Sequence, residues 1–327
     1  MISVVVPTVG RPSLGTLLDA LCAQIEAASV DVEVIVVADR PLPHDGPVVP
    51  AGVKVVSGRG AGPAAARNLG WQAARHEWVV FLDDDVVPGD GWLRTLATDI
   101  AVPAGVGGVQ GILDVPLPPG RRPTDWERVT AALAEGRWLT ADMAYRVDAL
   151  RAVGGFDERF PAAFREDADL AYRVRRAGWV LVRGRRRTVH PVRPESPWIS
   201  VRVQRGNADD ALLRRLYGAR WRTDLELPPG RRGRHAAITA AALAALLSRR
   251  LRPVAATAWL AGTAEFAWAR IAPGPRTPRE VATMLVTSAV IPPLAVGHWC
   301  LGWWRSRRLV RAAGRSSANP ACRTVSR

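Results

Sequence analysis

The stretch Trp78–Trp92, WVVFLDDDVVPGDGW, decides the fold of this 327-residue chain. Its first five residues, 78–82, form a mostly apolar run that is typical of a buried β-strand. Three consecutive aspartates, Asp83–Asp85, follow directly, and the chain then turns at a proline and two glycines. Because neighbouring like charges repel, such a cluster is either a hydrated turn or a place where a bound cation offsets the charge.

Outward from this stretch, apolar runs and helical patterns alternate along the chain. Further strands are expected at 2–7, 32–39 and 53–56. One face of a helix is indicated by the spacing of Leu14, Leu17, Leu18, Leu21 and Ile25, and a second helix is expected at 62–75. This alternation predicts an α/β fold in which helices cover both faces of a mostly parallel sheet.

Polar residues follow the ends of three of these strands. These residues are Thr8, Asp39 and Asp83–Asp85. In open α/β sheets, ligands bind beyond the carboxyl ends of the strands. Two carboxylates one residue apart can hold Mg²⁺ or Mn²⁺ and leave coordination positions open for phosphate oxygens. The alternatives are that the aspartates form a solvated turn and that Asp39 only caps its strand.

The C-terminal part of the chain differs in composition. A basic break at 228–234, PPGRRGR, precedes Ala/Leu-rich runs at 236–247 and 253–272. A third apolar run, 281–304, is uncharged apart from His298 and exceeds the about 20 residues that cross a bilayer. Helices that cross a membrane twice and helices that lie in its interface both fit this pattern, and a soluble Ala-rich helical domain is the alternative.

The charge and cysteine content suggest the partners and the compartment. The formal net charge is +15, Lys54 is the only lysine, and the arginines concentrate after Arg173. Such a balance is typical of proteins that bind nucleic acid, anionic lipid or phosphorylated ligands. The three cysteines are far apart, which argues against a disulfide framework or a zinc site and favours a reducing compartment. A basic, non-catalytic binder of nucleic acid or membrane surfaces is therefore one hypothesis.

Two classes of enzyme place a D-x-D pattern at the end of a strand. In the haloacid-dehalogenase-like phosphatases the first aspartate is the nucleophile, which would be Asp83 here. Those enzymes hold the phosphate with a downstream basic residue, normally lysine, and this chain has no lysine after Lys54. A phosphatase that uses Asp83 is therefore kept only as an alternative.

The second class is supported by six segments that occur in order. They are VVVPT (4–8), VVAD (36–39), GPAAARNLG (62–70), FLDDD (81–85), GGFDERF (154–160) and REDADLAYRVRRAGW (165–179). Together they resemble a family 2 glycosyltransferase with the GT-A fold over residues 1–220. The resemblance implies a Rossmann-like catalytic domain at 1–225, and we expect the Arg-rich, Ala/Leu-rich helical region at 226–327 to associate with a membrane.

The resemblance also implies roles for individual residues. Around the donor nucleotide sugar it implies Pro7, Thr8, Asp39, Arg67, Asp83 and Asp84. It implies Asp85 and His190 as ligands of a divalent metal, Mn²⁺ or Mg²⁺, and Asp167 as the general base that deprotonates the acceptor hydroxyl. Without the resemblance, the acidic residues at 166–169 would only complement a helix dipole, and His190 would be an ordinary core or loop histidine.

The expected activity is the inverting transfer of a single sugar from a nucleoside-diphosphate sugar to an acceptor hydroxyl. The QxxRW motif of the processive enzymes is missing, since Gln204 is followed by RGN. We expect a role in the synthesis of cell-envelope glycan, glycolipid or another glycoconjugate, with an acceptor that can be lipid-linked and no nucleic-acid partner. The catalytic domain is expected at the cytoplasmic face of the cell membrane.

Overall fold

The computed structural model describes residues 1–28, 31–40 and 49–316. The chain divides into two compact units. The N-terminal unit is Met1–Glu195 together with Asp224–Leu227, and the C-terminal unit is Ser196–Thr223 together with the chain from Pro228 onward. The predicted domain boundary at 225 therefore differs from this division, in which 196–223 belongs to the C-terminal unit. The assignment of the catalytic domain to 1–225 stays a prediction.

The N-terminal unit alternates strands and helices. Its elements are β1 (Ile2–Thr8), α1 (Ser13–Ala27), β2 (Val32–Ala38), β3 (Lys54–Ser57), α2 (Pro63–Ala73), β4 (Trp78–Leu82), β5 (Val87–Pro88), α3 (Trp92–Asp99), β6 (Val106–Asp114), α4 (Asp125–Ala131), β7 (Asp142–Arg146), α5 (Val147–Val153), α6 (Glu166–Arg176) and β8 (Val180–Val189). The four strands expected from the sequence correspond to β1–β4.

One sheet of eight strands forms the centre of this unit, in the order β3-β2-β1-β4-β7-β6-β8-β5. Strands β1–β4 pair in parallel, as expected. Beyond β4 the sheet is mixed, because β7 runs antiparallel to both β4 and β6, and β5 runs antiparallel to β8. The predicted α/β fold is confirmed, and the antiparallel part is what the strand patterns did not reveal.

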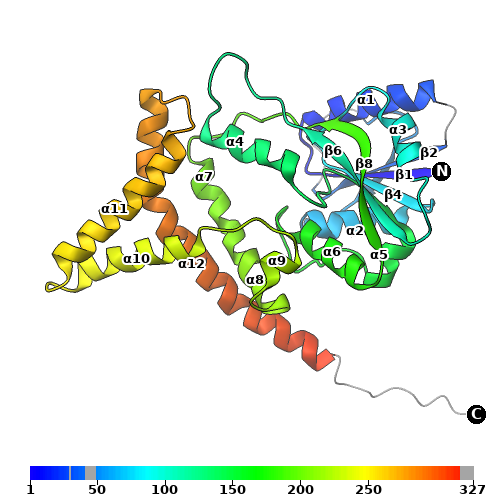
Figure 1. Ribbon diagram of the computed structural model, residues 1–327. Coiled ribbons are helices and arrows are strands. Elements are labelled where there is room, and N and C mark those ends of the chain that lie inside the picture. The colour runs from blue at the N-terminus through cyan, green and yellow to red at the C-terminus, as the bar shows by residue number, and fades with distance from the viewer. Residues whose placement is uncertain (29–30, 41–48, 317–327) are drawn as a thin grey trace, which may run out of the picture. The chain divides into compact units, whose positions relative to one another are not determined.

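Helices cover both faces of the sheet (Figure 1). On one face, α1 and α3 pack against a core that includes Val4 and Val6. On the other face, α2, α5 and α6 pack against a core that includes Val5 and Phe81. Successive side chains of a strand point to opposite faces, so both parities of β1 must be apolar, and the strand therefore reads as a continuous hydrophobic run.

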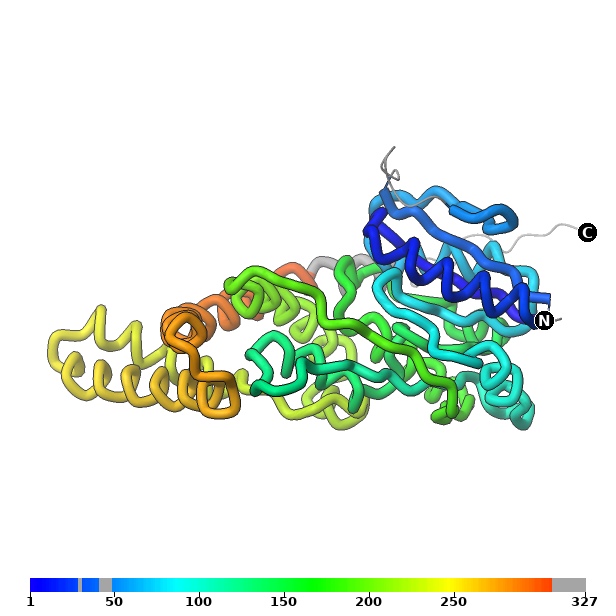
Figure 2. The backbone as a smooth tube through the Cα atoms, turned by 90° about the horizontal axis from the view of Figure 1, so that it is seen from above, coloured from blue at the N-terminus to red at the C-terminus, as the bar shows by residue number. Residues whose placement is uncertain are grey.

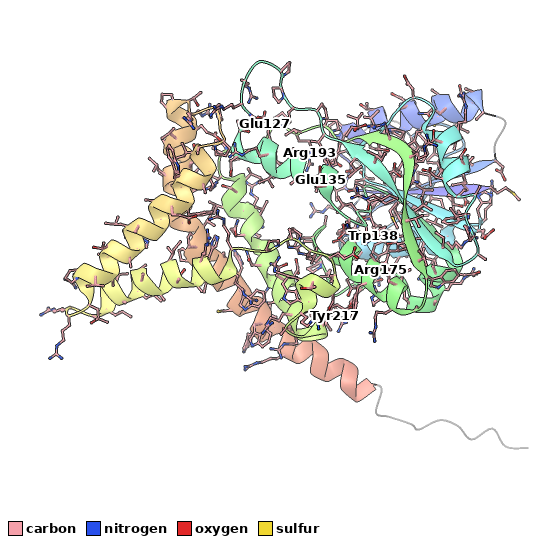
Figure 3. The ribbon with its side chains drawn as sticks, in the orientation of Figure 1. Glu127, Glu135, Trp138, Arg175, Arg193 and Tyr217 are labelled. Carbon is pink, nitrogen blue, oxygen red and sulfur yellow. The ribbon has the colours of Figure 1, made fainter. Side chains whose placement is uncertain are left out.

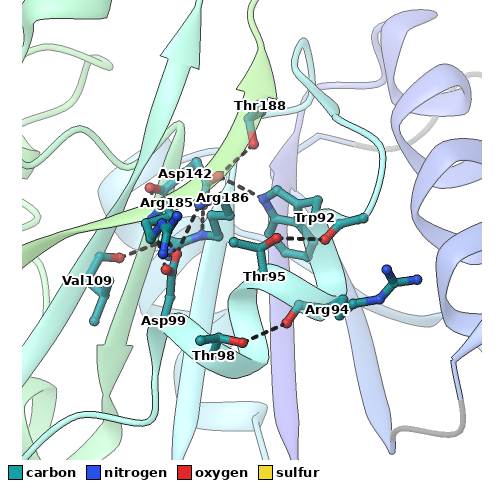
Figure 4. A network of polar contacts seen from close by, with 11 residues as sticks. Trp92, Arg94, Thr95, Thr98, Asp99, Val109, Asp142, Arg185, Arg186 and Thr188 are labelled. Carbon is teal, nitrogen blue, oxygen red and sulfur yellow. Dashed lines mark hydrogen bonds and ion pairs between the residues drawn. The ribbon is translucent and has the colours of Figure 1, made fainter.

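A buried arginine joins β7, β8 and α3 (Figure 4). Arg186 of β8 forms ion pairs with Asp142 at 2.7 Å and with Asp99 at 3.2 Å, and all three side chains are buried. Asp142 also accepts hydrogen bonds from Trp92 Nε1 (2.8 Å) and Thr188 Oγ1 (2.6 Å). Because a buried charge is tolerated only when it is paired and hydrogen-bonded, loss of one partner of this network would destabilise the fold.

The C-terminal unit is helical. Its elements are α7 (Ile199–Arg202), α8 (Asn207–Tyr217), α10 (Arg232–Leu247), α11 (Arg252–Ile271) and α12 (Pro278–Ser316), and α9 (Trp221–Asp224) lies where the chain returns to the N-terminal unit. Helices α10 and α11 run side by side as a hairpin, and the turn between them is its free end (Figures 1 and 2). Arg270 of α11 is buried and donates to Thr287 and Ser288 of α12, which ties these two helices together.

One helix of the described residues, Pro278–Arg307 within α12, is long and apolar enough to cross a membrane by length and composition. Only 33% of its most apolar window is buried inside the protein. The helix continues through Pro292 and Pro293.

Candidate active site

The ends of β1, β2 and β4 are neighbours, because β1 lies between the other two strands. Thr8, at the end of β1, donates from Oγ1 to Asp84 Oδ2 at 2.6 Å, and Arg11 forms an ion pair with Asp84 Oδ1. Pro7 is buried in β1. Both oxygens of Asp84 are thus engaged within the protein, and its side chain is 1% exposed. Contacts of Pro7, Thr8 and Asp84 with a nucleotide sugar remain predictions.

Asp39 follows β2 and faces the start of α2. Its Oδ2 accepts a hydrogen bond from the backbone N of Gly62 at 2.9 Å, whereas its Oδ1 is buried without a hydrogen-bond partner. Gly62 has φ 97°, and a Cβ there would lie 2.3 Å from the carbonyl oxygen of Pro161, so only glycine fits. Asp39 thus keeps one buried acceptor without a partner at the sheet edge, and its contact with a nucleotide sugar stays a prediction.

Arg67 of α2 connects the aspartate cluster to α6. Its side chain is 2% exposed, and it pairs with Asp83 at 2.7 Å and with Glu166 at 2.8 Å. Burial by itself would lower the pKa of Arg67, but the charges of Asp83 and Glu166 raise it above the ordinary value. Arg67 and Asp83, two of the residues expected around the donor, are thus in contact, and Glu166, to which the sequence assigned no site role, joins them. The guanidinium is engaged with protein carboxylates, and its contact with a donor stays a prediction.

The two acidic residues that open α6 differ in accessibility. Glu166 is buried, and burial together with the neighbouring charge of Asp167 raises its pKa to about 8. Asp167 is partly exposed, its Oδ1 accepts from the backbone N of Ala168 at 2.7 Å, and burial raises its pKa. Asp169 of the same turn is fully buried and pairs with Arg173 at 2.7 Å. Of the three carboxylates, Asp167 is the most exposed.

Asp85 turns toward the segment that follows β8. Its Oδ1 lies 3.9 Å from His190 Nε2, and its Oδ2 lies 3.2 Å from Arg193 Nε. Burial and the charge of Asp83 raise the pKa of Asp85, while His190 and Arg193 act in the opposite direction. His190 Nδ1 lies 3.3 Å from the carbonyl oxygen of Pro191; when it donates there, the lone pair of Nε2 faces Asp85.

A carboxylate is a donor suited to Mn²⁺ or Mg²⁺, and the imidazole that faces it can supply a nitrogen donor to the same ion. Within residues 1–28, 31–40 and 49–316, no group of three His, Cys, Asp or Glu side chains is arranged to hold a metal ion alone. Asp85 and His190 therefore fit a cation that draws its remaining ligands from water or from a bound anion.

Asn68 is a site-forming residue to which the sequence assigned no role. Its side chain donates to the carbonyl oxygen of Phe156 (2.9 Å) and accepts from the backbone N of Phe156 (2.8 Å). It also accepts from Trp71 Nε1 at 3.0 Å. These bonds fix the turn after α5 against α2, beside Arg67. The available signal was the occurrence of both segments, GPAAARNLG and GGFDERF, in one ordered set of motifs.

A second unpredicted contact holds the short segment Asp224–Leu227 on the N-terminal unit. The carboxylate of Glu226 accepts from Arg175 (2.8 Å), Trp138 Nε1 (2.9 Å) and Arg137 (3.3 Å). Trp138 and Arg175 are labelled in Figure 3. Burial would raise the pKa of Glu226, but the bond from Trp138 and the two arginines lower it. No sequence motif surrounds Glu226, so only the fold reveals this contact.

The sequence of the first part of the N-terminal unit matches a known family. Residues 3–130 match the family model of Glycosyl transferase family 2. This part of the chain is therefore similar to the family 2 glycosyltransferases. The match covers β1 to α4 and includes the aspartate cluster, whereas Asp167 and His190 lie beyond it.

The pre-mycofactocin glycosyltransferase of Mycobacterium tuberculosis is 35% identical to this chain over 131 residues. The aligned part covers 36% of this chain and 27% of that protein, so the chain spans only about a quarter of its relative. The similarity therefore concerns the glycosyltransferase domain and not the activity of the whole relative.

Among solved structures, a mannosyltransferase from Pyrobaculum calidifontis in complex with GDP-Man and Mn²⁺ superposes with a TM-score of 0.53. The sequences are 17% identical, and the alignment covers 93% of this chain and 87% of the mannosyltransferase. At this identity the similarity establishes the fold alone. The GT-A fold expected from the sequence is confirmed.

Proposed function

We propose that the protein transfers a single sugar, with inversion, from a nucleoside-diphosphate sugar to an acceptor hydroxyl, assisted by a divalent metal. The observation that carries the proposal is the bridge through Arg67. This one buried side chain contacts Asp83 in the aspartate cluster and Glu166 beside Asp167. Arg67 therefore links Asp83, one of the carboxylates expected at the donor, to the residue next to the expected base.

The donor would bind at the ends of β1, β2 and β4. Asp39 Oδ1, buried and without a partner, can accept a hydrogen bond from a nucleobase or ribose. Asp83 keeps 31% of its side chain exposed, which leaves room for a contact with the ribose.

Asp85 and His190 are the residues that would hold Mn²⁺ or Mg²⁺. When bound, the metal supplies positive charge that stabilises the leaving diphosphate. Arg193, which lies beside Asp85, adds a second positive charge on the same side of the site. A guanidinium offers a planar fork of N–H donors that suits phosphate oxygens.

Asp167 would perform the proton transfer. The acceptor oxygen attacks the anomeric carbon, the bond between that carbon and the diphosphate oxygen breaks, and the acceptor proton passes to a carboxylate oxygen of Asp167. Burial raises the pKa of Asp167, which makes its carboxylate a stronger base than a solvent-exposed one. A single displacement of this kind inverts the anomeric carbon and forms no covalent intermediate with the enzyme.

The comparisons support the reaction class but not the substrates. The mannosyltransferase of similar fold holds GDP-Man and Mn²⁺, which agrees with a nucleoside-diphosphate donor and a divalent metal. The acceptor is proposed to be a hydroxyl of a cell-envelope glycan, glycolipid or another glycoconjugate. The C-terminal unit is proposed to bring the catalytic domain to the cytoplasmic face of the membrane, because apolar helices and arginines make up much of it.

The test is a donor panel with purified protein and Mn²⁺, using UDP-, GDP-, ADP- and TDP-sugars. We expect one donor to raise the melting temperature and to release its nucleotide when an acceptor is present. Asp85→Asn should abolish the thermal shift, and Asp167→Asn should bind the donor but transfer about 10²–10⁴-fold more slowly. Asp148→Asn, which alters an exposed carboxylate of α5, is the matched control and should behave like the wild type.

Three results would contradict the proposal. The first is the lack of any donor-induced shift across the panel, and the second is an Asp167→Asn variant with full activity. The third is the release of phosphate from simple esters through a phosphorylated Asp83, which would favour a phosphatase.

A further inference from the structure

The α10–α11 hairpin of the C-terminal unit ends in an exposed apolar surface. On α10, Leu243, Leu246 and Leu247 occupy positions i, i+3 and i+4, which is one helix face. Leu246 is 74% exposed and Leu247 is 83% exposed. Leu251 and Val254, at the start of α11, are 56% and 74% exposed. These five residues, with the turn between them, are named the hairpin tip.

The hairpin tip is also strongly basic. Arg249, Arg250 and Arg252 are exposed within it, and the sequence contains no Asp or Glu from 228 to 264. Exposed leucines beside uncompensated arginines suit the boundary of an anionic bilayer, where apolar side chains enter the acyl region and guanidinium groups meet phosphates. A second copy of the same surface would bring like charges together, which disfavours self-association.

The apolar helix α12 is long enough to cross the bilayer, but its contacts within the C-terminal unit oppose a crossing. Its C-terminal part packs on α8 so closely that a Cβ at Gly302 would lie 2.4 Å from Ala208. Arg215 of α8 donates to Ser306 Oγ (2.8 Å) and lies over the ring of Trp303. Arg232 of α10 lies over Trp299 in the same way, 4.1 Å from its ring centroid.

A bilayer crossing by α12 would draw these arginines into hydrocarbon, or it would require α8 and α10 to separate from α12. A charged side chain at the centre of the bilayer lowers the equilibrium constant for insertion of the helix at least several-fold. The C-terminal part of α12 is therefore packed against α8 and α10 of the same unit.

We propose that the protein binds an anionic lipid surface through the hairpin tip, as a surface-bound protein, and that α12 stays within the C-terminal unit. This inference rests on the proposed membrane association and names the side chains that make the contact. It requires that the leucines of the tip enter the bilayer and that the arginines of the tip contact lipid phosphates.

The test uses the full chain in co-sedimentation with vesicles. One set contains phosphatidylglycerol and phosphatidylcholine, and the other contains phosphatidylcholine alone. The double variant Leu246→Ser/Leu247→Ser should lower the partition coefficient by about tenfold or more. Its matched control, Leu285→Ser/Leu301→Ser, removes two exposed leucines of α12 and should bind like the wild type. Both variants must keep the wild-type melting temperature.

The arginines give a second, independent measurement. Arg249→Gln/Arg250→Gln should weaken binding to phosphatidylglycerol vesicles by about fivefold per arginine and leave binding to phosphatidylcholine unchanged. The control Arg305→Gln/Arg307→Gln, in α12, should have little effect. An alkaline carbonate wash should release the wild type from vesicles, because a surface-bound protein has no segment across the bilayer.

Five outcomes would overturn the inference. The hairpin-tip variants could bind vesicles as the wild type does, or the α12 leucine variants could weaken binding as much as the tip variants. Retention of the wild type after the carbonate wash would indicate a crossing helix. Dimerisation in the absence of lipid that Leu246→Ser/Leu247→Ser abolishes would indicate a second copy on the tip. A wild type that binds none of the vesicles would refute membrane association itself. Donor binding and sugar transfer to a soluble acceptor are measured separately, so failure of the membrane proposal is distinguished from failure of the proposed activity.

Discussion

Two buried arginines of the N-terminal unit invite comparison. Arg67 and Arg186 are both almost fully buried, and each pairs with two carboxylates. Around Arg186 the bonding is complete, since Asp142 also accepts from Trp92 and Thr188. The Arg186 guanidinium donates further to the carbonyl oxygen of Val109 at 2.8 Å.

Around Arg67 the bonding is incomplete. Arg67 Nε and Glu166 Oε2 are buried without hydrogen-bond partners, as is the nearby acceptor Asp39 Oδ1. The pKa of Glu166 is raised to about 8 by burial and by Asp167. Unpaired buried polar groups cost stability, so a fold that keeps them usually has a use for them. The difference suggests that the network of Arg186 serves the fold and the network of Arg67 serves a ligand.

The largest expected effect on stability comes from Arg186→Leu. It leaves Asp99 and Asp142 buried without their cation, and breaking a buried pair in this way costs about 3–5 kcal/mol. Urea unfolding followed by circular dichroism measures this loss. If the free energy of unfolding changes by less than about 1 kcal/mol, the network of Arg186 does not carry the fold.

The next prediction separates the two arginines by activity. Arg67→Lys keeps the charge but cannot bridge Asp83 and Glu166, so the site shifts and the rate of sugar transfer should fall about 10²-fold. Arg186→Lys should lower the melting temperature while the rate per folded molecule stays near that of the wild type. Rates with the donor found in the panel, corrected for the folded fraction, measure both. Equal rate losses would remove the distinction between the arginines.

A pH series sharpens the comparison further. Between its ordinary pKa and about 8, Glu166 is protonated in the folded protein and ionised in the unfolded chain. The folded state then holds more protons, so stability should decrease as the pH rises through this window. Glu166→Gln should flatten the decrease, and the exposed control Glu195→Gln should not. Chemical unfolding from pH 5 to pH 9 is the measurement, and parallel curves for all three proteins would contradict the raised pKa.

The smallest expected effect comes from Arg187→Gln, next to Arg186 in the strand. Arg187 is exposed and pairs with Asp114 at 2.7 Å, and exposed ion pairs contribute about 0–1 kcal/mol. Urea unfolding beside Arg186→Leu tests this directly. A loss as large as that of Arg186→Leu would mean that burial is not what separates the two neighbouring arginines.

Sequence patterns predicted the elements that have a periodic or terminal signature. The continuous apolar strands β1, β2 and β4 have such a signature, and so do the polar residues at their ends. β8 has none, because its segment Arg183–Arg187 is rich in arginine, and arginine in a strand is usually exposed. Only the alternation of the pleat turns Arg186 inward and its two neighbours outward. Glu226 escaped prediction because its three partners lie about 50–90 residues away.

By itself, the sequence determined an α/β domain with a family 2 glycosyltransferase motif set and a cluster of aspartates at the end of a strand. Local chemistry suffices for this, because hydrophobic periodicity and strand-end polar residues are visible along the chain. Only the tertiary structure decided which carboxylates remain available. Asp84 is engaged by Thr8 and Arg11, and Glu166 by Arg67, while Asp167 stays partly exposed. Burial and pairing depend on residues far away in sequence, so no short stretch of sequence can specify them.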